Sequence, residues 1–442
     1  QVEKSPEMLN IYAACAQAGL VFLPLNPSYT VDELKYFIEN SEARLIICDE
    51  KNKEALKIIT QKLHVLFETL NGNSTGSIIE KANSATENFE TVARSEKDLA
   101  ALLYTSGTTG KSKGAMLTQA NLLSNGSTLM SEWQFSQKDV LLHALPLFHT
   151  HGLFVATNVI LSAGGSLIFL PKFDLDDIIK KLPKSSTMMG VPTFYTRLLR
   201  DKRFNKELVK HMRLFVSGSA PLLSETHIQF EKITGHRILE RYGMTETNMN
   251  TSNPYKGERR AGTVGLPLPG VELKVTDPKT GNALSRNEIG QIEVRGPNVF
   301  AGYWKLPEKT KIELRDNGFF ITGDLGKIDE DGYIHIVGRE KDLIISGGYN
   351  IYPKELELFI DDQDGVLESA VIGIPHPDFG ETPIAVIVSE NDTALDISKI
   401  KENFTTHVAR YKHPSQYAVV KELPRNSMGK VQKNLLRSRY GQ

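Results

Sequence analysis

Apolar and polar positions follow one recurring pattern through the first half of the chain. Short apolar runs at residues 45–48, 140–145, 187–191 and 213–217 predict buried strands, and segments with helical spacing follow them. Strands that alternate with helices are typical of a parallel sheet covered by helices. Further strands are expected at residues 20–25, 99–103, 166–170 and 237–240, and helices at 5–18, after the capping-box pair Thr30 and Glu33, and at 53–62.

The pattern changes near Gly265. Strands are predicted at residues 271–276, 291–295 and 333–337, with polar turns between them and no helical spacing. Such a region predicts a small antiparallel barrel or sheet without helices.

A second change follows Arg339. Helices at residues 353–361 and 397–409 and strands at 369–374, 384–389 and 417–421 predict a compact α+β unit of domain size. We therefore expect a large N-terminal domain over residues 1–339 and a small C-terminal domain over residues 340–442, with the boundary at 339–341.

Charge and composition limit the partners of this chain. Its 442 residues include 52 Lys and Arg against 53 Asp and Glu, and the net charge of −1 gives no basic field for nucleic acid. No apolar run is long enough to cross a bilayer. We therefore expect small-molecule partners, no nucleic acid and no membrane span, and composition leaves the oligomeric state open.

The two cysteines, Cys15 and Cys48, lie in apolar patterns and are expected to be buried thiols in a reducing compartment. This favours a cytoplasmic protein. The chain starts at Gln1 without an initiator methionine, so we expect that it begins inside a domain. An organelle matrix is the alternative if a preceding segment carries a transit peptide.

The most distinctive stretch is Tyr-Thr-Ser-Gly-Thr-Thr-Gly-Lys-Ser-Lys-Gly at residues 104–114, between the strand at 99–103 and a helix starting near Thr118. Glycines let backbone N–H groups approach a ligand closely, and hydroxyls and two lysines surround them, so the loop suits a polyphosphate. A nucleotide-hydrolysing P-loop would need glycine where Thr105 stands. A surface loop of the same composition is the other alternative.

Four further motifs carry chemical side chains: Tyr242 to Glu246 after a strand, Thr322-Gly323-Asp324, Gly338-Arg339 at the predicted boundary, and a loop with Lys430 near the C-terminus. Glu246 could bind Mg²⁺, Asp324 a ribose, and Arg339 a ribose or phosphate. Each motif alone is also compatible with an ordinary turn or surface residue.

Together the five motifs resemble the superfamily of adenylate-forming acyl-CoA synthetases, luciferases and peptide-synthetase adenylation domains, over essentially the whole chain. The family loop reads Thr-Ser-Gly-Thr-Thr-Gly-x-Pro-Lys-Gly, and Ser112 replaces its proline. The resemblance implies that the family's first segment, roughly one small βαβ unit, is lacking. The resemblance implies an α/β fold of stacked βαβα sheets with a small β-barrel, and a small mobile α+β C-terminal domain.

The resemblance also implies residue roles. Thr105 and Glu246 are the expected Mg²⁺ ligands, Lys430 the catalytic lysine and Lys341 the hinge. The loop facing coenzyme A is Ser346, Gly347 and Gly348, and Asn350 stands where many relatives have Arg or Lys. ATP and AMP are expected to contact Ser106, Gly107, Thr108, Thr109, Gly110, Lys111, Lys113, Gly218, Ser219, Ala220, Pro221, Glu240, Arg241, Tyr242, Gly243, Met244, Thr245, Asp324 and Arg339.

Within the superfamily, residues 144–153, 189–198, 241–249 and 258–265 most resemble malonyl-CoA synthetases. A second carboxylate held away from water must be paired, and arginine offers a bidentate match. Our first choice is Arg259, and Arg260, Arg213 and Arg197 are the alternatives. A solvated loop is the other explanation of Arg259 and Arg260. The residues expected to shape the acyl end are His149, Thr150, His151 and Met249.

The resemblance therefore implies an acid–thiol ligase that uses ATP, Mg²⁺ and coenzyme A. Malonate, or methylmalonate, would form an acyl-adenylate and pyrophosphate, and the thiol would then release AMP. A ligase for another small or medium-chain acid is the nearest alternative. Other classes are a P-loop NTPase or kinase, which would make ADP, a nucleotide sensor without turnover, and a luciferase, which would emit light.

Overall fold

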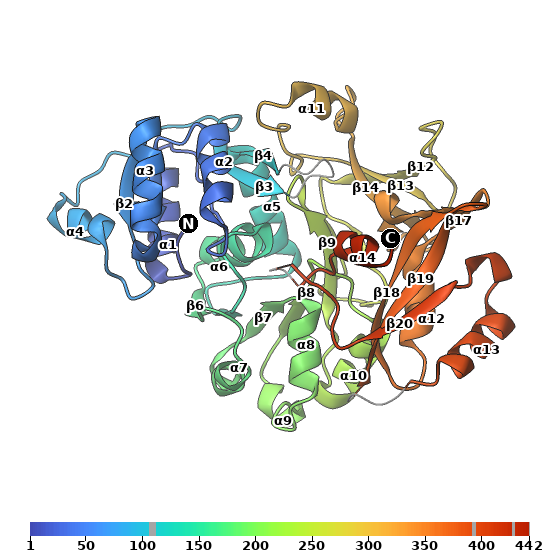
Figure 1. Cartoon of the computed structure of the whole chain (residues 1–442). Coiled ribbons are helices and arrows are strands. Elements are labelled where there is room, and N and C mark those ends of the chain that lie inside the picture. The colour runs from blue at the N-terminus through green and yellow to red at the C-terminus, as the bar shows by residue number, and fades with distance from the viewer. Residues whose placement is uncertain (106–111, 391–394, 427–428, 442) are drawn as a thin grey trace.

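The computed structural model describes residues 1–105, 112–390, 395–426 and 429–441, and Figure 1 shows how their helices and strands are arranged. The expected phosphate-loop residues Ser106, Gly107, Thr108, Thr109, Gly110 and Lys111 lie outside the described residues. The described strands form sheets of two, seven, four, five and two strands.

The largest sheet has seven strands in the order β11-β10-β9-β8-β7-β5-β6. The five strands from β6 to β9 are parallel, and β10 and β11 are added antiparallel at one edge. This confirms the α/β prediction. The strands are β5 (Val140–His143), β6 (Ser166–Phe169), β7 (Thr187–Gly190), β8 (Leu214–Ser217), β9 (Leu239–Met244), β10 (Asn248–Ser252) and β11 (Leu266–Pro267).

Helices cover both faces of this sheet because successive strand side chains point to opposite sides. Leu141 packs in one buried cluster with Leu129 of α5, and Leu142 in another with Leu198 of α8. The helices of these layers are α5 (Gln119–Glu132), the π-helix η2 (His151–Thr157), α6 (Asn158–Ser162), α7 (Leu175–Lys181), η3 (Leu182–Lys184), α8 (Pro192–Leu199), α9 (Lys206–Val209) and α10 (Ser224–Thr234).

The first hundred residues form a smaller α/β layer. The pair β1 (Leu45–Cys48) and β2 (Leu66–Thr69) is parallel, as expected. Thr30 and Glu33 form the predicted capping box, in which the Glu33 carboxylate accepts from Thr30 N–H at 2.8 Å. The helices here are α1 (Pro6–Gln17), α2 (Val31–Ser41), η1 (Glu50–Asn52), α3 (Lys53–Leu63) and α4 (Ser77–Ser84).

Two predictions near the phosphate loop need correction. Residues 20–25 form no strand, only one bridge between Phe22 and Ala101. The loop does not lead directly into the helix, because β3 (Leu99–Thr105) and β4 (Lys113–Thr118) pair as an antiparallel hairpin around it. The helix then begins after Thr118, whose hydroxyl accepts from Asn121 N–H at 3.2 Å.

The region after Gly265 contains a four-stranded antiparallel sheet, β12 (Glu272–Thr276), β13 (Gly290–Arg295), β14 (Phe320–Ile328) and β15 (Ile334–Arg339). The sequence predicts either a small barrel or a sheet here, and the structure contains a sheet. The expectation that this region lacks helices is wrong, because α11 (Pro307–Glu313) lies within it. No residue of α11 is buried, and its helix-start features are limited to Pro307 at the first position and Glu308 in the first turn.

The C-terminal unit has a sheet in the order β17-β16-β19-β18, with β20 parallel to β19. Apolar side chains are buried on both faces, for example Val371 on one and Ile372 on the other. The β16–β17 hairpin was not expected. The elements are η4 (Glu340–Asp342), β16 (Ile344–Ser346), β17 (Tyr349–Ile351), α12 (Pro353–Asp361), β18 (Val366–His376), β19 (Gly380–Ser389), α13 (Ile397–His407), η6 (Arg410–Lys412), β20 (Gln416–Val420) and α14 (Lys433–Tyr440).

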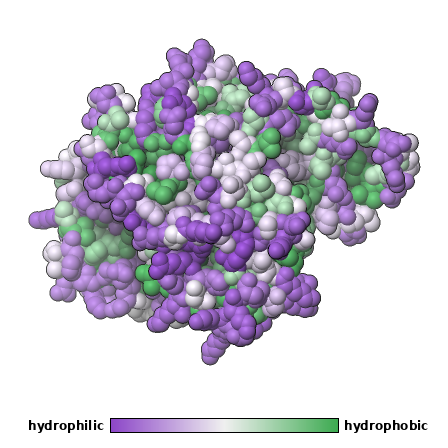
Figure 2. Space-filling view, turned by 180° about the vertical axis from the view of Figure 1, so that it is seen from behind, coloured by the Kyte–Doolittle hydropathy of each residue, from purple (hydrophilic) through white to green (hydrophobic). Residues whose placement is uncertain are grey.

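Apolar residues are gathered mainly in the buried clusters. Hydrophilic residues cover most of the face seen in Figure 2, and hydrophobic residues show there as separate patches. Within the described ranges, no helix combines the length and the apolar character that crossing a membrane requires. Both cysteines are free thiols, as expected, and Cys48 is buried as predicted, whereas Cys15 is only half-buried.

Candidate functional site

The candidate site lies where the parallel strands of the large sheet end. The segment 144–151 follows β5, the segment 218–221 follows β8, and residues 240–246 lie on and after β9. Ser217 pairs with Glu240 across β8 and β9, so the last two segments are neighbours. Ligands of open α/β sheets bind at this edge, which agrees with the predicted position of the site.

Three expected nucleotide-binding residues meet next to this edge. Asp324 and Arg339 face each other across β14 and β15, and Arg339 Nε lies 2.7 Å from Asp324 Oδ1. The Tyr242 hydroxyl donates to Asp324 Oδ2 at 2.5 Å. Burial and the Asp324 carboxylate raise the pKa of Tyr242 well above its ordinary value, so the phenol stays a donor. The carboxylate is thereby fixed in orientation at the edge of the site.

Lys430 enters the site from the C-terminal unit. Its backbone N–H donates to the Asn426 side chain at 2.9 Å, which shapes the loop that carries it. The Lys430 ammonium is close enough to His149 to lower the pKa of that imidazole, although burial is the larger cause and brings it to about 4. Desolvation and the nearby Arg339 in turn lower the pKa of Lys430. Lys430 therefore lies near both His149 and Arg339, two of the expected site residues.

Arg241 is the most unusual charged group of the site. It is only 3% exposed, and its Nε and Nη2 have no hydrogen-bond partner. Its guanidinium lies against the backbone of Gly218, where a Cβ would come within 2.4 Å of Arg241 Cζ. Burial lowers the pKa of Arg241 to about 9. Among the described residues no carboxylate forms an ion pair with it, so this corner of the site has a buried cation without a counter-charge.

His151 is next to this arginine. Its Nδ1 lies 3.1 Å from Ser219 Oγ, and its Nε2 has no partner. Burial, with the charge of Arg241 as the second cause, holds the pKa of His151 well below its ordinary value. The imidazole is therefore neutral and leaves the positive charge to Arg241.

The remaining expected acyl-end residues lie on the same side. Thr150 is buried and donates to Asn248 Oδ1 at 2.9 Å, and Met249 is fully buried on β10. Of the expected adenine-slot residues, Ala220 and Pro221 follow Ser219, and Gly243, Met244 and Thr245 follow Tyr242. Glu240 is different, because its carboxylate faces His227 of α10 at 3.6 Å and burial raises its pKa.

The expectation that Arg259 lines the acyl cavity is wrong. Its guanidinium donates to the carbonyls of Arg237, Pro254 and Tyr255, at 2.7, 3.3 and 2.9 Å. Arg237 precedes β9, so this contact lies at the amino edge of the sheet, opposite the site. The sequence proximity of Arg259 to Glu246 misled the prediction, since β10 runs antiparallel and carries the chain back to that edge.

Arg213 also lies at the amino edge of the sheet, opposite the site. It precedes β8 and forms a bidentate pair with Asp139, which precedes β5, at 2.6 and 2.9 Å. Burial alone would raise the pKa of Asp139, but the bonds from Arg213 hold it below its ordinary value. The pair is structural and leaves Arg213 without a role at the carboxyl edge.

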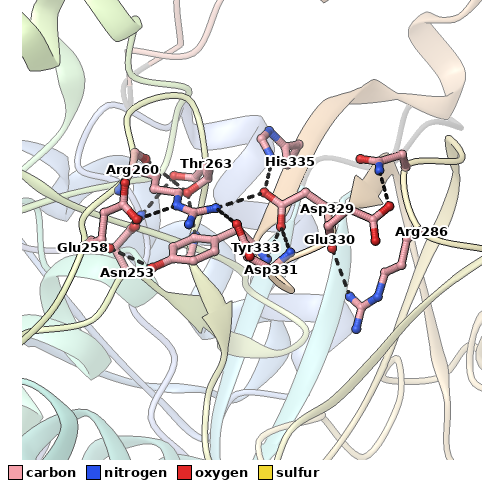
Figure 3. Close-up of polar contacts among 12 residues, drawn as sticks. Asn253, Glu258, Arg260, Thr263, Arg286, Asp329, Glu330, Asp331, Tyr333 and His335 are labelled. Carbon is pink, nitrogen blue, oxygen red and sulfur yellow. Dashed lines mark hydrogen bonds and ion pairs between the residues drawn. The ribbon is translucent and has the colours of Figure 1, made fainter.

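The guanidinium of Arg260 forms ion pairs with carboxylates near the β14–β15 turn. Figure 3 shows its guanidinium between Glu258, Asp329 and Asp331, with distances of 2.9, 3.6 and 2.8 Å. It also lies over the ring of Tyr333. This network holds the β14–β15 turn, and the solvated-loop explanation fits Arg260. The other alternative, Arg197, lies over the Phe173 ring at 5.9 Å.

The expected metal ligand Glu246 is 5% exposed. Its Oε1 accepts from the Tyr303 hydroxyl at 2.9 Å, and its Oε2 has no hydrogen bond to a described residue. Among the described residues no cluster of three or more His, Cys, Asp or Glu forms a complete metal cage. Mg²⁺ is commonly held by one or two carboxylates and the phosphates of its substrate. The Oε2 of Glu246, which no described residue contacts by a hydrogen bond, is compatible with this kind of site. Thr105, the other expected ligand, ends β3 beside the phosphate loop.

The expected hinge and coenzyme A loop lie in the C-terminal unit. Lys341 is the middle residue of η4, between β15 and β16. Gly347 and Gly348 form the tight turn between β16 and β17, with φ values of 56° and 82° that suit glycine. In Figure 1, β17 lies at the right-hand side of the molecule, away from β9.

Sequence analysis missed two residues that contact the site. Tyr303 and Glu313 are joined by a hydrogen bond of 2.7 Å, and Tyr303 also contacts Glu246. Neither residue belongs to one of the five motifs. A tyrosine after Gly302 and a glutamate in a short helix carry no pattern that distinguishes them from packing and surface residues.

A parallel sheet with helices on both faces, joined to a small α+β unit that inserts a lysine at its carboxyl edge, is the architecture of adenylate-forming enzymes. The chain belongs to the AMP-binding enzyme family: the family model matches residues 1–304, and the model of the AMP-binding enzyme C-terminal domain matches residues 355–430.

Two known proteins illustrate this relationship. The chain is 37% identical over 453 residues to a malonate–CoA ligase of Arabidopsis thaliana, covering 95% of this chain and 74% of that protein. It matches ATP-bound MatB from Rhodopseudomonas palustris with 56% identity and a TM-score of 0.98, covering 100% of this chain and 88% of that one. Against apo MatB, at the same identity and coverage, the TM-score is 0.85.

Proposed function

We propose that this chain is an AMP-forming malonate–CoA ligase. It condenses malonate with ATP to give malonyl-adenylate and pyrophosphate, and then transfers the malonyl group to the thiol of coenzyme A with release of AMP. The observation that carries the choice of a diacid is the buried, unpaired guanidinium of Arg241 at the acyl end of the site. The malonate–CoA ligase named among the relatives supports the same substrate.

Arg241 was expected from the sequence to contact the nucleotide, and we propose instead that it pairs with the distal carboxylate of malonate. A buried cation without a counter-charge is unfavourable, because removal from water costs several kcal/mol per ion. An anion that enters the pocket would relieve that cost, and the planar guanidinium offers two parallel N–H donors to a carboxylate. The neutral His151 and Ser219 add polar groups without adding charge. An apolar acid of the same length would leave the guanidinium unpaired.

For adenylation, the reacting carboxylate oxygen must meet the α-phosphorus of ATP. Asp324, which Arg339 and Tyr242 hold in orientation, is proposed to accept both ribose hydroxyls. Lys430 supplies a positive charge near the reacting carboxylate and the α-phosphate, where negative charge gathers in the transition state. Glu246 and Thr105 would hold Mg²⁺, which would supply charge neutralisation for the triphosphate. The protein then accelerates adenylation mainly by positioning the reactants and by electrostatic stabilisation.

For thioester formation, we propose that the C-terminal domain, residues 340–442, rotates about Lys341 relative to the domain of residues 1–339. The turn between β16 and β17 lies away from β9 in Figure 1, whereas Lys430 lies near His149 and Arg339, so the turn and Lys430 would face the site in different arrangements of the domain. The higher similarity to ATP-bound than to apo MatB supports the adenylation arrangement for the structure described. Coenzyme A would then approach from the side of the Ser346 to Gly348 loop.

A product assay tests the proposal. The chain is incubated with ATP, Mg²⁺, malonate and coenzyme A, and nucleotides, pyrophosphate and thioesters are separated by chromatography. We expect equal amounts of AMP, pyrophosphate and malonyl-CoA, each dependent on malonate. ADP with free phosphate would identify a P-loop NTPase or kinase instead. Nucleotide binding without any acid-dependent product would identify a sensor.

A further inference from the structure

The segment around Tyr303 joins two parts of the ATP site that are far apart in sequence. Trp304 N–H donates to the Gly114 carbonyl at 2.8 Å, so the segment runs beside β4, which follows the phosphate loop. Phe300 N–H donates to the Glu246 carbonyl at 2.8 Å, so the same segment also docks on the motif with the expected metal ligand. The Tyr303 side chain is thereby held between these two parts.

The Tyr303 hydroxyl contacts two carboxylates. The residue is 2% exposed, and its oxygen lies 2.9 Å from Glu246 Oε1 and 2.7 Å from Glu313 Oε2. A phenol has one proton to donate and an ionised carboxylate only accepts, so a single donor serves two acceptors. Burial of two carboxylates that share one hydrogen-bond donor is unfavourable unless nearby positive charges compensate them. The compensation must come from the cations around the network.

The nearby lysines that the structure describes pair with Glu313 and not with Glu246. Lys309 and Lys113 lie 2.6 and 3.6 Å from the Glu313 carboxylate. Burial alone would raise the pKa of Glu313, but the bonds from Lys309 and Tyr303 and the charge of Lys113 bring it below its ordinary value. In the part of the chain that the structure describes, no lysine or arginine forms an ion pair with Glu246. Glu246 is therefore the carboxylate that retains capacity for a further cation.

We propose that Tyr303 is a positioning residue for Glu246, and that Glu313 holds the Tyr303 hydroxyl in place. The Tyr303 hydroxyl fixes Glu246 Oε1, which leaves Oε2 oriented toward the metal-bound triphosphate. Lys113 lies 4.1 Å from the centre of the Tyr303 ring, so the network also reaches the strand after the phosphate loop. This inference rests on the proposed role of Glu246 as a Mg²⁺ ligand.

The test measures how ATP binding depends on Mg²⁺, by isothermal titration calorimetry of the full chain in EDTA and over a series of Mg²⁺ concentrations. For Tyr303→Phe we expect metal-free ATP binding to be unchanged and the Mg²⁺ concentration for half-maximal enhancement to rise about 10-fold or more, as for loss of other partners that orient metal ligands. Phenylalanine keeps the ring contact with Phe300, whose centre lies 4.8 Å away. Glu313→Gln is expected to shift the Mg²⁺ dependence in the same direction, and it tests the network independently should Tyr303→Phe not fold.

Two further variants separate the possible results. Tyr333→Phe removes a hydroxyl that donates to the Glu258 carbonyl outside this network, and should behave as the wild type. Glu246→Gln should lose the Mg²⁺ enhancement, and its retention would refute the metal role itself and the inference with it. Loss in Glu246→Gln with unchanged Mg²⁺ dependence in Tyr303→Phe and Glu313→Gln would overturn only the positioning role. Equal weakening of ATP binding with and without metal would also overturn it, since that result indicates a general structural role.

Discussion

The guanidinium of Arg241 occupies the space beside the Gly218 backbone that a side chain would otherwise fill: a Cβ on Gly218 would lie 2.4 Å from Arg241 Cζ and 2.5 Å from its Nη1. Gly218 directly follows β8, and Arg241 lies on the neighbouring strand β9. The glycine thus leaves room for a long cationic side chain at the proposed acyl end of the site. Two predictions follow from this contact.

Replacement of Arg241 by alanine should remove the partner of the distal carboxylate. We expect kcat/KM for malonate to fall by the equivalent of about 2–5 kcal/mol, as for loss of one partner of a buried charge pair. ATP binding should remain nearly unchanged, because Asp324 and Arg339 are untouched. Initial rates over a range of malonate concentrations, with ATP affinity measured separately, check this. Arg259→Ala is the matched control, and a larger loss of malonate preference in Arg259→Ala would refute the assignment.

Gly218→Ala should act through the same guanidinium. The added methyl group cannot share the space with Arg241 Cζ, so the guanidinium must move. We expect a raised KM for malonate and a smaller change in the KM for ATP. Steady-state kinetics with each substrate varied in turn measure both values. Equal effects on the two constants would indicate distortion of the whole edge rather than displacement of Arg241.

Lys430 should serve adenylation and not thioester formation. Lys430→Ala is expected to lose malonyl-adenylate formation by orders of magnitude, as removal of a positioned charged donor does. It should still convert supplied malonyl-adenylate to malonyl-CoA. The two half-reactions are measured by pyrophosphate release and by thioester formation. Equal loss of both would contradict the role.

The pH dependence of adenylation should also report Lys430. Desolvation and Arg339 lower its pKa, and the protonated ammonium is the active form, so activity should be present at neutral pH and lost as pH rises through that lowered pKa. The loss should therefore begin below the range of an ordinary lysine, about 10.4. In Lys430→Arg, any remaining activity should not show this alkaline loss, because guanidinium stays protonated. An unchanged alkaline limb in that variant would assign the titration to another group.

The proposed hinge is tested by Lys341→Pro. Proline fixes the local φ angle and should impede rotation of the C-terminal domain. We expect near-normal adenylation and slow transfer to coenzyme A in single-turnover experiments. Unimpaired transfer would show that the hinge lies elsewhere or that no rotation is required.

Sequence patterns predicted the layers of this fold because burial repeats along each element. Leu141 and Leu142 alternate between two faces, and Thr30 with Glu33 forms the expected capping box. The four-residue runs at the central strands are apolar for the same reason. By contrast, α11 has no buried residue, and β4 follows a glycine- and lysine-rich loop, so neither carries a strong periodic pattern.

The site was only partly predictable for a related reason. Tyr242, Asp324 and Arg339 belong to short motifs and do meet, at 2.5 and 2.7 Å. The choice of Arg259 depended on distance along the chain, which does not reveal at which edge of a sheet a residue emerges. Only the paired register of β8 and β9 brings Arg241 beside Gly218. Tyr303 was not predicted for the same reason, because its contact with Glu246 joins residues that are 57 positions apart in the sequence.

The most direct test of the account is a competition between two acids for one enzyme. Equal concentrations of malonate and butyrate are supplied with ATP, Mg²⁺ and limiting coenzyme A, and the ratio of malonyl-CoA to butyryl-CoA is measured by mass spectrometry for the wild type and Arg241→Ala. We predict that malonyl-CoA dominates in the wild type and that the ratio falls by about 30-fold or more in the variant, the equivalent of at least 2 kcal/mol. Butyryl-CoA as the main wild-type product, or an unchanged ratio in Arg241→Ala, would contradict the proposal that Arg241 selects a diacid.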